Sequence, residues 1–186
     1  NPSTEDILNA ADKINADTIF VLPNNSNIIL ASNQAASIIE DKKLIVIPTK
    51  TIPQGITAMI NFELTRSADE NEKAMLESLS TVKSGQLTYA VRDTSIDGKE
   101  IKKDNYLGLG DNGLASVGTD MDDTLIDMLS EFVDDESELI SVYYGEDIDE
   151  NKAEELVYKI EEKFDGVDVE LQYGGQPVYY YIVSVE

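Results

Sequence analysis

The stretch "TIFVLPNNSNIILASNQAASIIEDKKLIVIP" (residues 18–48) decides the fold of the first half of the chain. It begins with an apolar run at residues 18–22 and ends with a second one at 43–48, where Pro48 stops it. Runs that are apolar at successive positions are typical of strands buried on both faces. Residues 26–39 between them have the length and composition of a helix. Strand, helix and strand in this order predict a parallel βαβ unit.

Further helices flank this unit on both sides. Ser3 and Asp6 have the spacing of a capping box, which predicts a helix start near the N-terminus. Proline suits the first turn of a helix, so the sequence predicts another helix over 53–64. A third is expected over 71–82, and its inward side chains are expected to be Met75, Leu76, Leu79 and Val82. Residues 1–84 are therefore expected to form an α/β lobe with a parallel sheet.

The pattern changes near Gly85. Asp97-Gly98 and Asp111-Asn112-Gly113 are turn sequences between strand-like runs, so residues 86–118 are expected to form an antiparallel meander. Two amphipathic helices and three strands are expected to follow, and the last two strands are expected to form a pair around residues 174–177. We expect the helix after the meander to start with a capping box of Thr119 and Asp122. Residues 85–186 are therefore predicted to be an α+β lobe.

The composition excludes several classes of function. The chain has 14 Lys and Arg against 37 Asp and Glu, a net charge of −23, and such a surface repels nucleic acid and anionic membranes. It contains no Cys and no His, which excludes disulfides, thiolate or imidazole zinc sites, and histidine-based catalysis. No apolar run reaches the ~18 residues of a membrane span. We see no signal peptide and expect a cytoplasmic protein.

Two motifs are weighed and set aside. Gly108-x-Gly110-x-x-Gly113 matches a dinucleotide-binding pattern, but no helix is expected after it, so we interpret these as simple turn glycines. Asp93, Ser95, Asp97 and Asp104 imitate part of a calcium loop, but that loop needs flanking helices and a terminal Glu. We therefore expect no metal site.

Charged residues elsewhere also have plain interpretations. The acidic run "MDDTLIDMLSEFVDDESE" (121–138) places its carboxylates mostly opposite an apolar stripe, which is typical of a solvated helix face. Arg92, on a predicted strand, is a weak candidate for gripping a carboxylate or phosphate. A surface ion pair is the simpler interpretation of Arg92 in so acidic a chain. No catalytic residue is predicted.

Polar side chains gather where the two parallel strands end. Ligands of open parallel sheets bind outside the carboxyl ends of the strands. The segments "PNNSN" (23–27) and "PTKTIPQG" (48–55) follow the two strands and should lie on one edge. Helix capping accounts for one or two of these side chains. We predict a partner- or ligand-binding rim, hereafter the rim, made of Asn24, Asn25, Asn27, Thr49, Lys50, Thr51 and Gln54.

Several segments in order resemble a known family. They are "NPSTEDIL" (1–8), "LPNNSNIILAS" (22–32), "VIPTKTIPQGITAM" (46–59), "YAVRD" (89–93) and "GGQPVYYYIVSVE" (174–186). Together they resemble the C-terminal region of the bacterial fatty acid kinase subunit, which is related to dihydroxyacetone kinases. The resemblance implies a two-lobed DegV-like fold. It also implies a larger parent, with an ATP-binding domain first and a zinc-containing middle domain next.

The resemblance implies a supporting role rather than catalysis. In this family the kinase phosphorylates a fatty acid carboxyl held by a separate fatty-acid-binding subunit, for phospholipid synthesis, and the C-terminal region is expected to engage that subunit. ATP and Mg would belong to the parent's first domain, and no cofactor is expected in this chain. Because the chain begins with Asn1, we expect it to be an excised piece of a longer protein.

Two alternatives stay open. The chain itself could hold a fatty acid or similar anionic lipid between its lobes, with Arg92 or Lys50 gripping the carboxylate. It could also be a stand-alone enzyme on a small anionic substrate that relies on Lys, Asp, Glu or Tyr. The acyl chain preference and the role of the tyrosines are not decided by the sequence.

Overall fold

The computed structural model describes residues 1–96 and 98–186, and these form two compact units, Asn1–Val82 and Lys83–Glu186. The predicted Asp97-Gly98 turn and the calcium-like pattern include Asp97, which lies outside the described residues. The predicted division into an α/β lobe at residues 1–84 and an α+β lobe at residues 85–186 stays a prediction. No helix among the described residues has the length and apolarity that a membrane crossing requires.

Unit 1 is built on two parallel strands, β1 (Thr18–Val21) and β2 (Lys43–Val46). They pair in register from Thr18 opposite Lys43 to Val21 opposite Val46. The helix that connects them, α2 (Ser26–Ile38), completes the predicted βαβ unit. The βαβ prediction from residues 18–48 is therefore confirmed.

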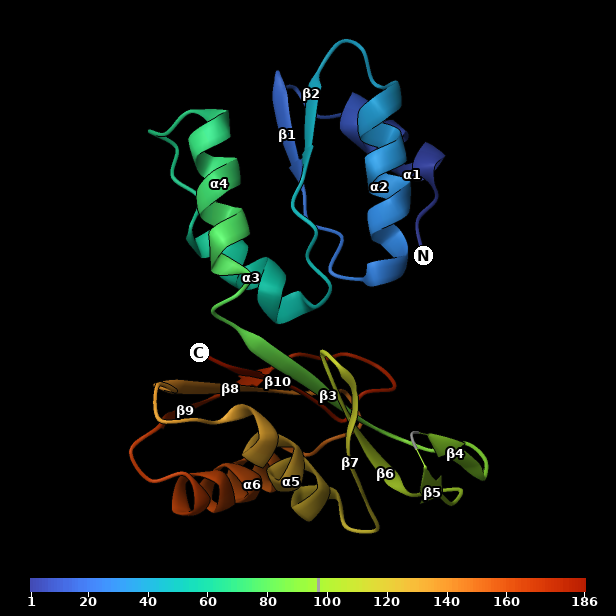
Figure 1. Cartoon of the computed structure of the whole chain (residues 1–186), viewed down its shortest axis with the longest axis vertical. Helices are drawn as coiled ribbons and strands as arrows, with labels where there is room; N and C mark the ends of the chain where they lie inside the picture. Colours follow the sequence, from blue (N-terminus) through green and yellow to red (C-terminus); the bar gives the residue numbers. More distant parts are fainter. Residues whose placement is uncertain (97) are drawn as a thin grey trace. The chain divides into compact units, whose positions relative to one another are not determined.

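Helices cover both faces of this small sheet (Figure 1). On one face α1 (Thr4–Asp12) and α2 pack against β1 and β2 through a cluster around Ala35 and Leu44. On the other face α3 (Ile52–Ile60) and α4 (Ala68–Ser78) pack through Ile47, Ala58 and Met75. The predicted capping box at Ser3 and Asp6 opens α1. The inward position predicted for Leu76 is wrong, because its side chain is 40% exposed.

Unit 2 is a six-stranded sheet with helices on one face (Figure 1). The strands of unit 2 are β3 (Lys83–Tyr89), β4 (Thr94–Ile96), β5 (Lys99–Ile101), β6 (Tyr106–Gly110), β7 (Gly113–Gly118), β8 (Leu139–Tyr144), β9 (Asp168–Tyr173) and β10 (Tyr181–Val185). The strand order in the large sheet is β7-β6-β3-β10-β8-β9, and β4 and β5 form a separate antiparallel pair that lies between β3 and β6 in the chain. The helices α5 (Met121–Phe132) and α6 (Glu150–Lys163) bury Leu125, Leu129 and Leu156 against the large sheet.

The two final strands do not pair with each other, so that prediction is wrong. β9 lies parallel to β8, and α6 makes the crossover between them. β10 instead lies antiparallel between β8 and β3, with Tyr181 opposite both Tyr144 and Leu87. The strongly apolar β10 is buried at all five positions, so it occupies the centre of the sheet rather than an edge.

Three glycines let α5 approach the sheet closely. A Cβ on Gly85 or Gly108 would lie within about 3 Å of the Met128 side chain, and one on Gly110 would lie 2.8 Å from the Phe132 ring. Gly108 lies inside β6, so the interpretation as a turn glycine is wrong for this residue. Gly110 and Gly113 form the strand pair that flanks the turn at 111–112, and Gly113 has a φ of 113°.

The cap of α5 is shifted by one residue from the prediction. Asp120, not Thr119, is the N-cap, and its carboxylate accepts the N–H of Asp123 at 3.0 Å. An Asp side chain accepts as readily as a Thr hydroxyl at this position. The chain offers both residues side by side, so spacing alone could not choose between them.

Candidate functional site

The structure brings the two predicted rim segments together at one edge of unit 1. The backbone N–H of Asn24, after β1, donates a hydrogen bond of 2.9 Å to Oγ1 of Thr49, after β2. Thr49 is fully buried, so its hydroxyl ties the two loops together from within. The parallel strands put both loops at the same edge, as the topology predicts.

Asn24 has an unusual backbone and an unsatisfied side chain. Its φ is 54°, in the left-handed region that Asn tolerates better than most residues. Its side-chain Oδ1 is buried and has no hydrogen-bond partner among the described residues. A Cβ added to Gly55 would lie only 2.2 Å from this oxygen. The side-chain amide of Asn24 therefore packs directly on α3 at Gly55.

Three other rim side chains hold the loops in place. Oδ1 of Asn25 accepts the N–H of Asn27 at 2.9 Å and caps α2, and Oγ1 of Thr51 accepts the N–H of Gln54 at 3.4 Å and caps α3. Oε1 of Gln54 accepts the N–H of Lys50 at 2.8 Å. Capping and loop bracing therefore engage more of the rim than the sequence indicates. The side chains of Asn27 and Lys50 remain exposed at the edge.

In α3, the helix that begins at the rim, small and polar residues are buried and large apolar residues are exposed. Its buried residues are small or polar, among them Gln54, Gly55 and Thr57, whereas its large apolar residues point to solvent. The exposed fractions are 49% for Ile52, 37% for Ile56, 66% for Met59 and 75% for Ile60. We call these four residues the α3 apolar face.

Sequence reasoning missed this surface. Positions 52, 56, 59 and 60 have the spacing of one helical face, and that spacing is typical of a face turned toward the core. The signal that could have revealed it lies on the opposite face, where Gly55, Thr57 and Ala58 are small enough for close packing on a sheet. Exposed apolar side chains that share one helix face are candidates for an interaction site.

The other candidate residues lie apart from the rim in sequence and belong to unit 2. Arg92 lies beyond the end of β3, not on a strand, and is exposed. The surface ion pair expected for Arg92 is not among the ion pairs of the described residues. Oδ1 of Asp93 accepts the N–H of Lys103 at 2.7 Å. Within residues 1–96 and 98–186, no three acidic side chains converge as a metal site would require.

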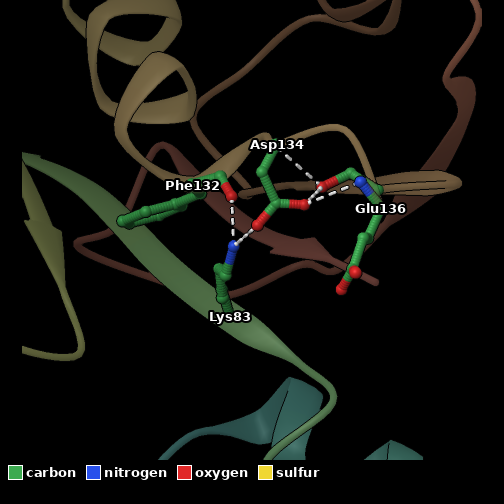
Figure 2. A network of polar contacts seen from close by, with 5 residues as sticks. Lys83, Phe132, Asp134 and Glu136 are labelled. Atoms are coloured by element: carbon green, nitrogen blue, oxygen red, sulfur yellow. Dashed lines mark hydrogen bonds and ion pairs between the residues drawn. The ribbon is translucent and has the colours of Figure 1, made fainter.

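A polar cluster at the start of β3 has a structural role. Lys83 Nζ pairs with the carboxylate of Asp134 and donates a bond of 2.7 Å to the carbonyl of Phe132, at the end of α5 (Figure 2). Asp134 also accepts the N–H of Glu136 at 3.0 Å and the hydroxyl of Ser137 at 3.1 Å. A cation at a helix C-terminus stabilises the helix dipole. Lys83 therefore fastens the end of α5 to the sheet.

Solved structures of known proteins share this fold. The chain is similar over its whole length to the DegV family protein Cg2579 from Corynebacterium glutamicum, with a TM-score of 0.71, 11% identity and 83% of that chain covered. It is also similar to the fatty acid kinase (Fak) B3 protein of Streptococcus pneumoniae loaded with linoleic acid, with a TM-score of 0.69, 14% identity and 76% coverage. The dihydroxyacetone kinase of C. freundii is similar with a TM-score of 0.61 and 12% identity, and 41% of that chain is covered. The DegV-like fold predicted from the sequence is confirmed.

The sequence places the chain in a family. Residues 1–186 match the model of the FakA-like (fatty acid kinase) C-terminal family, and the chain belongs to this family. Protein YloV of Bacillus subtilis (strain 168) is 46% identical over all 186 residues. The chain spans 34% of the length of that relative, or about a third.

Proposed function

We propose that this chain is the non-catalytic C-terminal domain of a fatty acid kinase, and that it docks the fatty-acid-binding subunit. The acyl carboxyl held by that subunit is then phosphorylated by an ATP-binding domain elsewhere in the parent chain. Family membership and the 34% coverage of a longer relative support a division of labour between this chain and further domains.

The α3 apolar face is the observation that carries the docking role. A helix that exposes Met59 and Ile60 and buries Gly55 has its apolar surface directed away from the core. Each exposed aliphatic side chain costs free energy in water that a covering partner would recover. The exposed Lys50 beside it supplies a polar margin, as interface rims do.

The residue inventory supports the absence of catalysis in this chain. It has no His and no Cys, so proton transfer and nucleophilic attack would fall to carboxylates, lysines or tyrosines. The rim side chains are amides, hydroxyls and one lysine, and several of them already brace loops. Such groups hold a partner or a ligand better than they transfer a phosphoryl group.

Binding measurements with single-site variants test this function. We expect the chain to bind its cognate fatty-acid-binding subunit, loaded with oleic acid, in isothermal titration calorimetry. Ile60→Lys should raise the dissociation constant at least about tenfold, because a charge would be buried without a partner. Leu30→Lys on α2 is the matched control, since Leu30 is similarly exposed at 77% but lies outside the α3 apolar face. No association at about 100 µM, or equal effects of both variants, would contradict docking through α3.

A second candidate function is that the chain holds a fatty acid itself. The linoleic acid carried by the similar Streptococcus pneumoniae protein and the exposed Lys50 beside an apolar helix face favour it. Arg92 is the other cation considered for the carboxylate. Mass spectrometry of the gently purified chain separates the two functions, because a stoichiometric co-purified fatty acid supports lipid binding and its absence leaves docking.

A further inference from the structure

A groove of about 500 Å³ runs between α6 and β9 in unit 2, far along the sequence from the rim. Its floor is apolar and includes Val157, Val169 and Leu171. Three tyrosines, Tyr144, Tyr158 and Tyr173, stand around it. The groove belongs to a single compact unit, so its shape does not depend on the other unit.

One wall of this groove is an open sheet edge. Among the described residues, β9 is the last strand of the sheet and β8 is its one neighbour. Asp168 donates its N–H to the carbonyl of Glu138 at 3.0 Å, and Gly174 donates to Tyr144 at 3.0 Å, so the even-numbered residues bond inward. In a parallel strand the alternate residues then direct their N–H and C=O groups outward. These are Val169, Leu171 and Tyr173, whose side chains line the groove.

The opposite wall is a row of carboxylates. Glu150, Glu154 and Glu161 occupy one flank of α6, and no Lys or Arg lines the groove with them. None of the ion pairs formed by the described residues involves these three glutamates. The groove therefore presents carboxylates that form no ion pair with the lysines and arginines of the described residues.

Tyr144 adds a polar group without a partner. The residue is 8% exposed and lines the groove, and the described residues provide no hydrogen bond to its hydroxyl. Its ring lies 5.2 Å from that of Tyr173, which is 66% exposed. Burial raises the pKa of Tyr144, and the nearby Glu150 raises it further. The hydroxyl therefore stays protonated and can donate a hydrogen bond into the groove.

We propose that the groove between α6 and β9 binds an extended segment of a partner protein that has lysine or arginine at every second position. This segment pairs with β9 and becomes a further strand of the sheet. Main-chain groups of the segment pair with the outward groups of β9, which is β-strand addition. Every second side chain then lies on the α6 side, where its cation meets the glutamates and its stem lies on the apolar floor.

The charge of the groove selects this occupant over others. A second copy of the chain carries the same net charge of −23, so the carboxylates of the groove repel it. An anionic lipid surface is repelled for the same reason. The inference concerns a surface different from the α3 apolar face and does not depend on the proposed docking of the fatty-acid-binding subunit.

A peptide titration tests the proposal. The probe is a fluorescein-labelled nine-residue peptide that alternates lysine and valine, followed by fluorescence anisotropy with the 186-residue chain. We expect saturable binding that weakens with salt. The double variant Glu154→Gln/Glu161→Gln should raise the dissociation constant at least about tenfold. Glu155→Gln/Glu162→Gln is the matched control on the same helix, with the same change in net charge, and should change it less than about twofold.

A second arm separates strand addition from ionic attraction alone. The same peptide with every backbone amide N-methylated keeps its charges but cannot donate main-chain hydrogen bonds. We expect it to bind at least about tenfold more weakly, and we expect the unmethylated peptide to shift the amide NMR signals of Val169, Leu171 and Tyr173. Equal binding of both peptides, equal effects of the two double variants, or no saturation by about 1 mM would overturn the proposal.

Discussion

Asn24 and Gly55 form a contact in which one residue depends on the other. Asn24 holds a left-handed backbone, and its amide occupies the space where any larger residue at position 55 would place its Cβ. The hydrogen bond from Asn24 to Thr49 fixes the loop over this spot. The amide oxygen has no partner among the described residues, so its burial costs free energy that the hydrogen bond and the packing of the loop offset.

We predict that Gly55→Ala destabilises the chain when Asn24 is present. In a chain that carries Asn24→Gly, the same substitution should instead stabilise the fold. Alanine alone favours a helix by about 1 kcal/mol over glycine. The 2.2 Å contact of its Cβ with Asn24 adds overpacking of roughly 1–3 kcal/mol, which outweighs that gain. In the Asn24→Gly background the space is free, and glycine allows a φ of 54°. Urea unfolding of the four proteins of this double-mutant cycle measures the change in the free energy of unfolding. The same effect of Gly55→Ala in both backgrounds would contradict the contact.

At the scale of elements, unit 2 is held by contacts between segments distant in the chain. Lys83 opens β3 and reaches Phe132 and Asp134 at the end of α5, 49 and 51 residues further on (Figure 2). Glycines on β3 and β6 admit Met128 and Phe132 of the same helix. The position of α5 is therefore fixed at its C-terminal end by one cation and along its length by the small residues beneath it.

We predict that the Lys83–Asp134 contact stabilises unit 2 in a pH-dependent way. Hydrogen bonding to Lys83, then to Glu136 and Ser137, lowers the pKa of Asp134 in the folded chain. A lowered folded pKa means that the stabilisation is complete above the unfolded value near 3.9 and is lost as the pH falls through the folded value. Asp134→Asn should therefore lower the urea midpoint at pH 6 and have little effect near pH 2. Asp135→Asn, which makes none of these contacts, should change little at pH 6, and a constant difference across this pH range would argue against the ion pair.

At the scale of the whole molecule, negative charge dominates. The chain carries 37 acidic and 14 basic residues, and the described residues form five ion pairs. These pairs are substantially exposed, and each such pair contributes no more than about 1 kcal/mol. Repulsion among the remaining carboxylates therefore outweighs them.

We predict that salt stabilises the chain. Raising NaCl from about 20 to 300 mM shortens the screening length below the distance between many surface carboxylates. The thermal midpoint should rise by a few degrees, since about 1 kcal/mol corresponds to roughly 2–4 °C at this chain length. Differential scanning calorimetry measures the midpoint, with an equal concentration of a neutral osmolyte such as glycerol as the control for solvent effects. A midpoint that falls with salt would mean that attractive ion pairs dominate instead.

The sequence by itself determined the local elements. The capping box at Ser3, the apolar runs at 18–22 and 43–48 and the helix between them were all predictable, because caps and periodicity depend on residues only a few positions apart. The acidic surface and the exclusion of histidine and cysteine chemistry also followed from composition.

Only the tertiary structure decided which elements meet and which faces stay open. The place of β10 between β3 and β8 depends on partners far apart in the chain, and adjacency in sequence wrongly paired it with β9. The exposed face of α3 likewise depends on what packs beside the helix. A periodic apolar stripe states that a helix has two unlike faces, but the packing of the rest of the chain decides which of them meets water.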